Sequence, residues 1–585
     1  MIYSAIPLAQ TVIQLCKAKQ IQHIVISPGS RNAPLTIGFT HDSYFTCYSI
    51  VDERCAAFFA LGIAQQLKEP VAVACTSGSA LLNYYPAISE AFYSHIPLVV
   101  LSADRPEHMV GIGDGQTINQ PNVFKNHILY SANLKLDVKE SHQRFSSEPI
   151  PVFKTLELKL EHFLNLQNHA QTSNETEINL ALNKARTQPG PVHINIPFEE
   201  PLYNRVESLL VNPEVIEVEA ESLELDFETI EFCADDWNEA ERKLVLIGVN
   251  GPNDIEQKYL DVFAEDDSVI VFTETTSNVH QKGFFPSIDK LITPLTDEEF
   301  KALQPDILLT FGGLIVSKRI KAFLRTYKPK QHWHASIQKP NDTFFSLNKH
   351  IQTTPNQFLS QLTIRITIVE SEYKTYWNKV KQYREFKHNA YVKDMLYSDF
   401  KVFDILMSTL RKDSVLQLGN SSTIRYSQLF DLPFDVEVFC NRGTSGIDGS
   451  TSTAIGCAVA NPKPTTLITG DLSFLYDSNA LWNNYIPKDF RIIVINNEGG
   501  GIFRILPGHK NTENFDCFFE TKHHLTAKHL AKMYNFDYQT ASNEYELASE
   551  LDTFYSESNA PKILEIFTPS TINDSILIDY FKALK

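Results

Sequence analysis

Two polar segments of the chain carry oxygen atoms of the kind that bind Mg²⁺. Gly470-Asp471-Leu472-Ser473 follows one apolar run, and Asn496-Asn497-Glu498-Gly499-Gly500 follows the next. Because each segment begins where an expected strand ends, with a helix between them, Asp471 and Asn497 should share one edge of a parallel sheet. A carboxylate, an amide oxygen and a nearby backbone carbonyl suit Mg²⁺, which completes its octahedron with phosphate oxygens and water.

The glycines of these segments would let a phosphate group approach the backbone. Gly470, Gly499 and Gly500 have no side chain, and the helix expected after Ser473 would turn its N-terminus toward a diphosphate. Turns rich in Asp, Asn and Gly are also common in loops that bind nothing. The strand-helix-strand spacing favours a metal and diphosphate site, while the turns taken alone leave both interpretations open.

Glu53 is a second candidate, because it follows an apolar strand and begins an Ala-rich helix that continues to about Leu67. Its carboxylate is either a charge that stabilises the helix start by ~0.3–1 kcal/mol or a buried acid–base group. Asp52 and Arg54 beside it could serve the helix start equally well. The local sequence leaves both roles open.

Short apolar strands alternate with helices through the first 200 residues. Strands are expected at His23–Ile26, Phe45–Val51, Val71–Cys75 and Pro97–Leu101, with one helix to about Leu67 and another from Ser79 to about Ser94. This alternation predicts a parallel sheet with right-handed crossovers. Ligands of such sheets lie beyond the carboxyl ends of the strands, where the intervening loops meet.

The last third of the chain repeats this organisation. Strands are expected at Val415–Leu418, Val436–Cys440, Thr465–Thr469 and Arg491–Ile495. The units Val71–Leu101 and Thr465–Ile495 have the same order of elements and nearly the same length, although their sequences barely match.

The middle of the chain differs from both ends. An acidic connector without basic residues runs between Arg205 and Arg242, strands are expected at Lys243–Val249 and Asp306–Phe311, and an aromatic-rich helical stretch occupies roughly 370–400. We therefore predict an α/β chain of three domains (1–200, 201–370 and 371–585). Two similar, doubly wound parallel-sheet domains would flank a divergent α/β middle domain.

The composition excludes several classes of protein. The chain of 585 residues is 43% hydrophobic and 21% charged, which is typical of a packed enzyme and not of a disordered chain. Its net charge of −18 argues against nucleic-acid binding. The longest apolar runs, Ala56–Ala64 and Ile96–Leu101, are too short to cross a membrane. The N-terminus does not resemble a signal peptide, and the scattered cysteines indicate free thiols in the cytoplasm.

Together these segments resemble thiamine-diphosphate-dependent enzymes of the pyruvate decarboxylase type. The likeness rests on Glu53 at its helix start, TSGSALLN at 76–83 and GDLS…NN at 470–497. A narrower similarity, to the branch that joins 2-oxoglutarate to isochorismate in menaquinone biosynthesis, rests on ISPGSRNAPL (26–35), DERCAAFFALGIA (52–64), SADRPEH (102–108), GQTINQ (115–120), NRGTSGIDG (441–449) and GDLSFLYDSNAL (470–481). The similarity runs from about residue 2 to 570 and is thin in the middle domain.

The resemblance implies two cofactors, thiamine diphosphate and Mg²⁺ (or Mn²⁺). They would bind between the pyrimidine domain of one subunit and the diphosphate domain of its partner, in a homodimer or a dimer of dimers. Glu53 matches the catalytic glutamate that hydrogen-bonds the aminopyrimidine ring, while Asp471, Asn497 and the Gly499 carbonyl match the metal ligands. Ile447 matches the hydrophobic prop that bends the cofactor. The implied cofactor-binding set is Pro28, Glu53, Ser77, Gly78, Asn83, Gln116, Ser421, Ser445, Ile447, Asp471, Leu472, Ser473, Asn497, Gly499 and Gly500.

The implied reaction decarboxylates 2-oxoglutarate and adds the resulting succinyl carbanion equivalent to isochorismate. Both substrates are polycarboxylates, so a chain of net charge −18 must gather cations locally. The planar fork of arginine holds a carboxylate with two charge-assisted bonds. The implied substrate-binding set is Ser30, Arg31, Arg105, Gln116, Lys318, Ser421, Arg425, Arg442, Ile502 and Phe503. For any single arginine the alternative is a surface ion pair worth ~0–1 kcal/mol, and for Ile502 and Phe503 a plain core role.

Two positions depart from the pattern of the branch. Gly115 stands where relatives commonly carry an asparagine, so one substrate hydrogen bond is in doubt. Glu498 replaces an asparagine beside the expected metal ligands and adds negative charge there.

Two other functions remain as alternatives. One is an acetolactate synthase-like enzyme or another 2-oxoacid decarboxylase of the same cofactor family, against which the set of arginines speaks. The other is a non-catalytic relative that binds the cofactor, against which Glu53, Asp471 and Asn497 speak.

Overall fold

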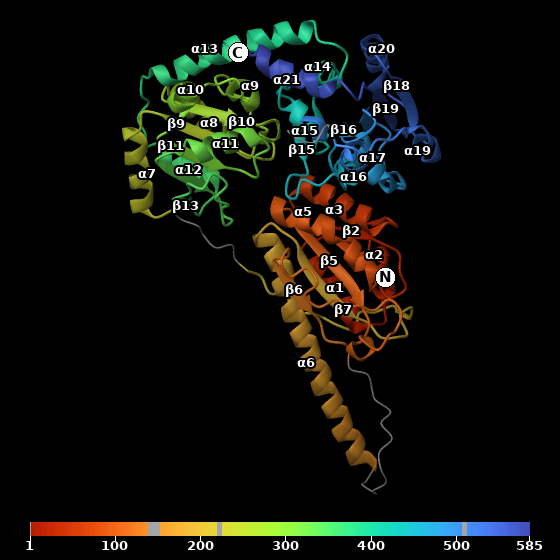
Figure 1. Ribbon diagram of the computed structural model, residues 1–585. Coiled ribbons are helices and arrows are strands. Elements are labelled where there is room, and N and C mark those ends of the chain that lie inside the picture. The colour runs from red at the N-terminus through yellow and green to blue at the C-terminus, as the bar shows by residue number, and fades with distance from the viewer. Residues whose placement is uncertain (1, 138–151, 219–224, 506–511) are drawn as a thin grey trace. The chain divides into compact units, whose positions relative to one another are not determined.

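The computed structural model describes residues 2–137, 152–218, 225–505 and 512–585 (Figure 1). For residues 152–165 it describes the backbone alone. Three parallel β-sheets with flanking helices follow one another along the chain, which confirms the α/β class. The acidic residues Glu219, Glu221 and Glu224 of the expected connector lie outside the described residues. The domain boundaries near residues 200 and 370 stay predictions.

The chain forms two compact units. The first unit comprises Met1–Ala220, Thr451–Pro462 and Asp477–Pro487, and the second comprises Glu221–Ser450, Lys463–Tyr476 and Lys488–Lys585. The first unit is therefore built from three separate stretches of sequence.

The sheet of the first unit has six parallel strands in the order β3-β2-β4-β5-β7-β6. The strands are β2 (His23–Ile26), β3 (Thr46–Ser49), β4 (Val71–Cys75), β5 (Leu98–Asp104), β6 (Tyr130–Asn133) and β7 (Val192–Pro197), and a short antiparallel pair, β1 (Tyr3–Ser4) with β8 (Arg205–Val206), lies apart from them. Every residue of β4 and β5 is buried, as expected for central strands covered on both faces. The helices are α1 (Pro7–Ala18), α2 (Ala33–His41), α3 (Glu53–Leu67), α4 (Ser79–Asn83), α5 (Tyr85–Ser94) and α6 (Val152–Thr187).

Three expected elements of this unit had wrong bounds, and the first is the strand expected over Phe45–Val51, which forms only over Thr46–Ser49. β5 continues to Asp104 and does not end at Leu101, because Asp104 still pairs with Pro197 of β7. The single helix expected from Ser79 to Ser94 is divided at Tyr84 into α4 and α5. Pro86 lies in the first turn of α5, where its missing N–H is tolerated, whereas the interior of a continuous helix would lose a hydrogen bond there.

Helix α3 and helix α16 (Ser450–Ala460) cross at two glycines. A Cβ atom added to Gly62 would lie 2.1 Å from the carbonyl oxygen of Thr453, and one added to Gly456 would lie 2.0 Å from that of Phe59. These distances are far below van der Waals contact, so the two backbones touch where no side chain fits. The pair of glycines thus joins a late segment of the chain to the first unit.

Replacement of Gly456 by alanine is expected to lower the midpoint of thermal unfolding. Alanine gains up to about 1 kcal/mol in helix propensity over glycine. Forcing a methyl group against the Phe59 carbonyl moves backbone atoms, at a cost of about 1–3 kcal/mol or more, so the net effect is a loss. Calorimetry of Gly456→Ala tests this, with Gly115→Ala as the control because no atom lies within 4 Å of its added Cβ. Equal midpoints for the two variants would contradict the crossing.

The second unit contains two sheets, of which the first has five parallel strands in the order β10-β9-β11-β12-β13. These are β9 (Lys243–Ile247), β10 (Val269–Thr273), β11 (Ile307–Phe311), β12 (Gln331–Ala335) and β13 (Lys349–Ile351). Val245 and Ile247 belong to one buried cluster, while Leu244 and Leu246 belong to another. The sheet is therefore covered on both faces, by helices drawn from α7 (Phe227–Glu239), α8 (Gln257–Glu265), α9 (Ile288–Ile292), α10 (Asp297–Leu303), α11 (Lys318–Thr326) and α12 (Pro355–Leu362).

The other sheet of the second unit has six parallel strands in the order β15-β14-β16-β17-β19-β18. These are β14 (Ser414–Leu418), β15 (Val436–Cys440), β16 (Thr465–Gly470), β17 (Arg491–Asn496), β18 (Asp537–Ala541) and β19 (Lys562–Phe567). Numbered within its own sheet, each strand holds the same place as its counterpart in the first unit. The expected similarity of the two end regions is thus confirmed at the level of topology.

Two helical segments of the second unit differ from expectation. The aromatic-rich stretch forms α13 (Glu372–Lys393) and is followed by a separate helix, α14 (Asp399–Ser408). The helix expected after Ser473 begins at Asp471 itself, as α17 (Asp471–Tyr476). The remaining helices are α15 (Ser422–Ser427), α18 (Ile502–Ile505), α19 (Lys528–Met533), α20 (Glu544–Phe554) and α21 (Asn573–Ala583). No helix within the described ranges is both long and apolar enough to cross a membrane.

Candidate active site

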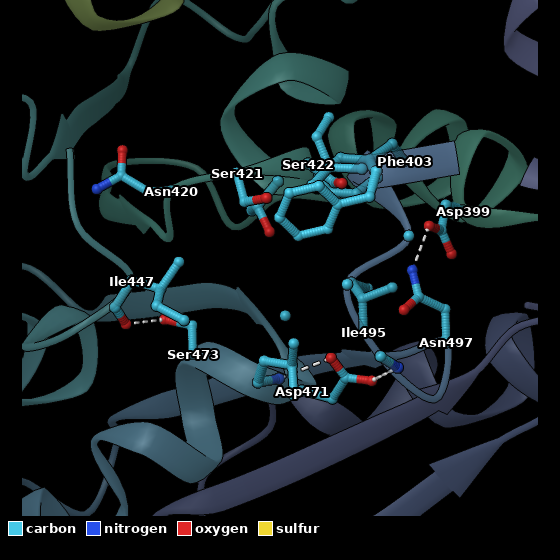
Figure 2. Close-up of a pocket in the computed structure, with 18 residues that line it drawn as sticks. Asp399, Phe403, Asn420, Ser421, Ser422, Ile447, Asp471, Ser473, Ile495 and Asn497 are labelled. Carbon is cyan, nitrogen blue, oxygen red and sulfur yellow. Dashed lines mark hydrogen bonds between the residues drawn. The ribbon is translucent and has the colours of Figure 1, made fainter. Parts of the chain in front are cut away.

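A cavity of about 190 Å³ lies at the carboxyl ends of β14, β16 and β17 (Figure 2). Parallel sheets place their ligand sites at this edge, where the chain leaves each strand. The cavity collects eleven of the residues singled out from the sequence: Ser421, Ile447, Gly470, Asp471, Leu472, Ser473, Asn497, Gly499, Gly500, Ile502 and Phe503. Asp399, Phe403, Asn420, Ser422, Thr423, Ile495 and Gly501 complete the lining.

Asp471 ties together the two loops that the sequence placed on this edge. Its Oδ1 accepts a hydrogen bond from the Leu472 N–H at 2.6 Å, and its Oδ2 accepts one from the Gly499 N–H at 3.0 Å. His523 Nε2 lies 3.3 Å from the same Oδ2, and the neighbouring carboxylate raises the pKa of His523. The loop after β17 requires glycine at position 499, whose φ is 147° and whose Cβ would lie 2.6 Å from the Glu520 carbonyl oxygen.

Among the described residues, the Asn497 side chain has one hydrogen-bonding neighbour, and the amide directs its oxygen atom away from it. Its Nδ2 donates to Asp399 Oδ2 at 2.8 Å (Figure 2), and a carboxylate that only accepts must face the nitrogen end of the amide. Asn497 Oδ1 is buried and has no hydrogen-bond partner among the described residues. A buried oxygen without a partner is costly, so this atom fits a role as ligand to a cation.

The donor set fits a hard cation rather than a structural zinc ion. Within the described residues no cluster of three or more His, Cys, Asp or Glu side chains could hold a metal ion alone. A cation beside Asp471 and Asn497 would instead be bound by one carboxylate, one amide oxygen, a backbone carbonyl and oxygen atoms of a ligand. Mg²⁺ uses few protein ligands in this way when it accompanies phosphate groups.

A second set of hydrogen bonds holds the loop that carries Ile447. Ser473 Oγ donates to the Ile447 carbonyl at 2.7 Å (Figure 2), and Asn420 Nδ2 donates to the Gly446 carbonyl at 2.7 Å. Ile447 is 36% exposed and borders the cavity, so its side chain is free to contact a ligand. Ser445 has a φ of 60° and lies in the same loop, but it is absent from the described lining.

Two of the expected cations adjoin this cavity through residues that line it. Arg425 Nη1 donates to the Ser421 carbonyl at 2.7 Å, and Arg442 Nη1 donates to Asn420 Oδ1 at 2.6 Å. Burial and the nearby positive charge of Arg442 lower the pKa of Arg425. A buried site that brings two guanidinium groups together favours an anion, because a negative charge relieves their repulsion.

Lys318 is the first residue of α11. Glu274 holds this helix start by accepting hydrogen bonds from the N–H groups of Val316 and Ser317, each at 2.7 Å. Burial raises the pKa of Glu274 to about 7, although the two N–H donors and the Arg442 charge oppose the rise. Lys318 itself is exposed and does not line the cavity as described.

The first unit brings together several of its own predicted residues. Arg105 Nη1 donates to Ser77 Oγ at 3.2 Å, and Ser77 Oγ donates to the Gln116 carbonyl at 2.9 Å. Arg105 Nε also donates to Asp114 at 2.9 Å. Burial, and then the nearby charge of Arg105, lower the pKa of Arg31. Ser77, Gln116 and the two arginines therefore lie together at the carboxyl edge of the sheet, where Asp114 pairs with Arg105 and Glu200 lies 3.6 Å from Arg31.

The other predicted residues of this unit surround that edge less closely. The Gly78 N–H donates to Gln120 Oε1 at 2.9 Å, which holds the turn after β4. Pro28 and Ser30 are exposed in the loop after β2, and Asn83 is exposed at the end of α4. Gly115 meets no atom within 4 Å of an added Cβ, and Glu498 pairs with His524 at 3.1 Å.

Glu53 is the first residue of α3, but it does not cap the helix. Asp52 is the N-cap, since its Oδ1 accepts a hydrogen bond from the Cys55 N–H at 3.2 Å. The Glu53 carboxylate is half-buried and has no hydrogen bond or ion pair within the described part of the chain. It lies close enough to the buried Cys75 thiol and Tyr84 hydroxyl for its charge to raise the pKa of both groups, after the larger effect of burial.

Reasoning from the sequence missed four residues of these clusters, namely Asp399, Asn420, His523 and Asp114. Asn420 follows β14 in the segment Leu418-Gly419-Asn420, so the rule that polar residues follow strands would have found it. Asp399 has no such signal, because it begins a helix and meets Asn497 across 98 positions of sequence.

Comparison with known proteins completes the description of this site. Residues 6–127 match the family "Thiamine pyrophosphate enzyme, N-terminal TPP binding domain". The chain is 55% identical to a protein of Flavobacterium psychrophilum and 56% identical to one of Christiangramia forsetii, with 100% of each chain covered. It is 36% identical to a protein of Phocaeicola vulgatus, over 98% of each chain. Each of these relatives is named 2-succinyl-5-enolpyruvyl-6-hydroxy-3-cyclohexene-1-carboxylate synthase.

Proposed function

The chain belongs to the family of 2-succinyl-5-enolpyruvyl-6-hydroxy-3-cyclohexene-1-carboxylate synthases, and from this premise we propose that it makes that product in menaquinone biosynthesis. It is a transferase that forms a carbon–carbon bond. It decarboxylates 2-oxoglutarate and joins the remaining succinyl group to isochorismate. The observation that carries this proposal is the identity of 55% with a named synthase over the full length of both chains.

The cofactor is thiamine diphosphate, and we propose that Mg²⁺ (or Mn²⁺) binds with it. Asp471, Asn497 and the Gly499 carbonyl would hold the metal ion, since the buried Asn497 Oδ1 has no partner among the described residues. When bound, thiamine diphosphate supplies the stabilisation of negative charge on carbon that both the decarboxylation and the addition require.

The roles of the protein residues follow from their positions. Glu53 would accept a hydrogen bond from the pyrimidine end of the cofactor, because its half-buried carboxylate is not used to cap α3. Ile447 would support the bend of the cofactor. The remaining cofactor contacts would come from Pro28, Ser77, Gly78, Asn83, Gln116, Ser421, Ser445, Leu472, Ser473 and Gly500.

The substrates carry several carboxylates, which the two groups of cations would bind. Arg31 and Arg105, with Ser30 and Gln116, would form one group. Arg425 and Arg442, with Lys318 and Ser421, would form the other, and the contacts of Arg105, Arg425 and Arg442 described above support this proposal. Ile502 and Phe503 would exclude water from the apolar side of the pocket, because they border the cavity beside Gly500. The loss of CO₂ then proceeds where bulk water does not compete for protons.

We further propose a homodimer, or a dimer of such dimers, in which Glu53 of one subunit serves a cofactor held by the partner's diphosphate domain. The compartment would be the cytoplasm, because the eight cysteines, all among the described residues, form no disulfide and all but Cys47 and Cys517 are buried. Light scattering combined with activity measurements tests the assembly. A monomer that turns over substrate would exclude a shared site.

The proposed reaction is tested by incubation of the protein with 2-oxoglutarate, isochorismate, thiamine diphosphate and Mg²⁺. Mass spectrometry should detect the succinylated product only when all four are present. Turnover of pyruvate but not of 2-oxoglutarate would favour an acetolactate synthase-like enzyme or another decarboxylase. Isothermal titration without any heat of thiamine diphosphate binding would favour a non-catalytic relative.

The Arg105→Lys protein is expected to have a KM about 10–100-fold higher for at least one of the two substrates. Lysine keeps the charge but loses the planar fork, and a charge-assisted hydrogen bond contributes about 1.5–3 kcal/mol. Steady-state kinetics with each substrate varied in turn measure the effect. Arg186→Lys serves as the control, because within the described ranges Arg186 forms a single, exposed ion pair, with Glu217 at 3.8 Å. Unchanged KM values for both substrates would remove Arg105 from the substrate site.

A further inference from the structure

We propose that Asp399 is a positioning residue that fixes the Asn497 amide so that its oxygen atom, and not its nitrogen atom, faces the metal ion. The proposal rests on the proposed function, because it presumes that a divalent cation binds at Asp471 and Asn497. It adds a residue that does not touch the cation and acts only through Asn497.

The contact between Asp399 and Asn497 selects one orientation of the amide. An asparagine amide can turn end for end, which exchanges its oxygen and its NH₂ group at nearly the same positions. Asp399 Oδ2 accepts a hydrogen bond from Asn497 Nδ2 at 2.8 Å (Figure 2). An ionised carboxylate only accepts hydrogen bonds, so it favours the orientation that sends Oδ1 to the other side. The opposite orientation would place two oxygens in contact and present an NH₂ group to the cation.

Asp399 is itself held in place by other residues. Its side chain is buried, its Oδ1 accepts a hydrogen bond from Thr568 Oγ1 at 2.5 Å, and its N–H donates to Asn573 Oδ1 at 2.9 Å. Thr568 follows β19, and Asn573 begins α21. A residue after β19 therefore holds the carboxylate, and the first residue of α21 holds the backbone of Asp399, before any ligand binds. Such support from neighbouring groups is typical of metal ligands.

Helix α14 does not need the Asp399 carboxylate as a cap. Asp399 is the first residue of α14, but Ser398 is the N-cap, and its Oγ accepts a hydrogen bond from the Lys401 N–H at 3.3 Å. A carboxylate in the first turn of a helix also stabilises the helix through its dipole, typically by about 0.3–1 kcal/mol. Any acidic residue in this turn would provide that, so the dipole does not explain why this carboxylate contacts Asn497. The Asp399 side chain is instead buried, and its two oxygen atoms accept hydrogen bonds from Asn497 and Thr568.

The test measures binding of Mn²⁺ by electron paramagnetic resonance in the presence of saturating thiamine diphosphate, which needs no turnover. Loss of a residue that orients a metal ligand typically weakens metal binding by about 10–100-fold. We expect a loss of that size for Asp399→Ala. We expect a loss below about threefold for Asp399→Asn, because the asparagine oxygen can still accept the hydrogen bond from Asn497.

Asp266→Ala is the matched control for the loss of a buried carboxylate in the same unit. Asp266 is buried and accepts hydrogen bonds from the Ser268 N–H and hydroxyl, but it does not line the cavity as described. We expect this variant to unfold at a lower temperature and to bind Mn²⁺ within about twofold of the wild type. Folded Asp399→Ala protein that binds Mn²⁺ as well as Asp266→Ala does would overturn the proposal.

An exchange of the two side chains tests the proposal even if Asp399→Ala does not fold. Asn497→Asp alone puts two carboxylates in contact, so we expect weaker binding of Mn²⁺. Adding Asp399→Asn places an amide donor opposite the new carboxylate and should recover at least tenfold of the affinity. Equal affinities of the single and double variants would overturn the proposal. Failure of the wild-type protein to bind Mn²⁺ at all would instead contradict the proposed function.

Discussion

The Glu53→Gln protein is expected to lose about 10²–10⁴-fold in turnover, which is the usual contribution of a positioned acid or base. Glutamine keeps the size of the side chain but cannot take up or share a proton at the pyrimidine ring. The helix itself should be unaffected, since Asp52 provides the cap by accepting the Cys55 N–H. Affinity for thiamine diphosphate should stay within roughly tenfold of the wild type, because the metal ion and the diphosphate loops provide most of the binding.

The measurement combines kcat at saturating substrates with isothermal titration of the cofactor. Glu69→Gln provides the matched control. It replaces the same carboxylate by the same amide, but at an exposed position just beyond α3. That variant should retain the turnover of the wild type. If Glu53→Gln also retained it, Glu53 would be no more than a charge at the start of a helix.

The Asp471→Ala protein should bind thiamine diphosphate at least about 100-fold more weakly in Mg²⁺, a loss of about 2.7 kcal/mol. Alanine removes an expected metal ligand. It also removes the acceptor that joins the Leu472 and Gly499 N–H groups, so the loops on both sides of the cavity lose their common partner. The cofactor should consequently no longer raise the midpoint of thermal unfolding, whereas it should raise that of the wild type.

A second substitution separates the two effects of Asp471. Asp471→Asn keeps one acceptor oxygen but loses the charge, so its cofactor affinity should fall between those of the alanine variant and the wild type. Asp516→Ala removes a carboxylate that forms an exposed ion pair with Lys522 at 2.9 Å, and it should bind the cofactor normally. Unchanged affinity in Asp471→Ala would count against the whole ligand set.

Much of the fold could be predicted because it follows local rules. The apolar run Val71–Cys75 and the largely apolar run Val436–Cys440 are strands with the expected bounds. Asp471 and Asn497 meet because each follows a strand of one parallel sheet, and β16 and β17 are direct neighbours. Topology alone therefore brought together two residues that are distant in sequence.

The rest depended on contacts that no local pattern contains. β5 extends to Asp104 because β7, from a remote part of the chain, continues to pair with it. The choice between Asp52 and Glu53 at the start of α3 was decided by one hydrogen bond to Cys55. The role inferred for Asp399 depends on burial and on Asn497, and neither can be read from the residues around position 399.

The crossing of α3 and α16 at Gly62 and Gly456 has a consequence for synthesis of the chain on the ribosome. Residues 1–220 emerge first, but the compact unit to which they belong also requires 451–462 and 477–487. Until those segments are translated, the backbone of α3 at Gly62 lacks the backbone of α16 against which it packs, and the first unit is incomplete. The nascent N-terminal region therefore stays incompletely folded until more than two hundred further residues have been translated. In this interval a chaperone would protect it from aggregation.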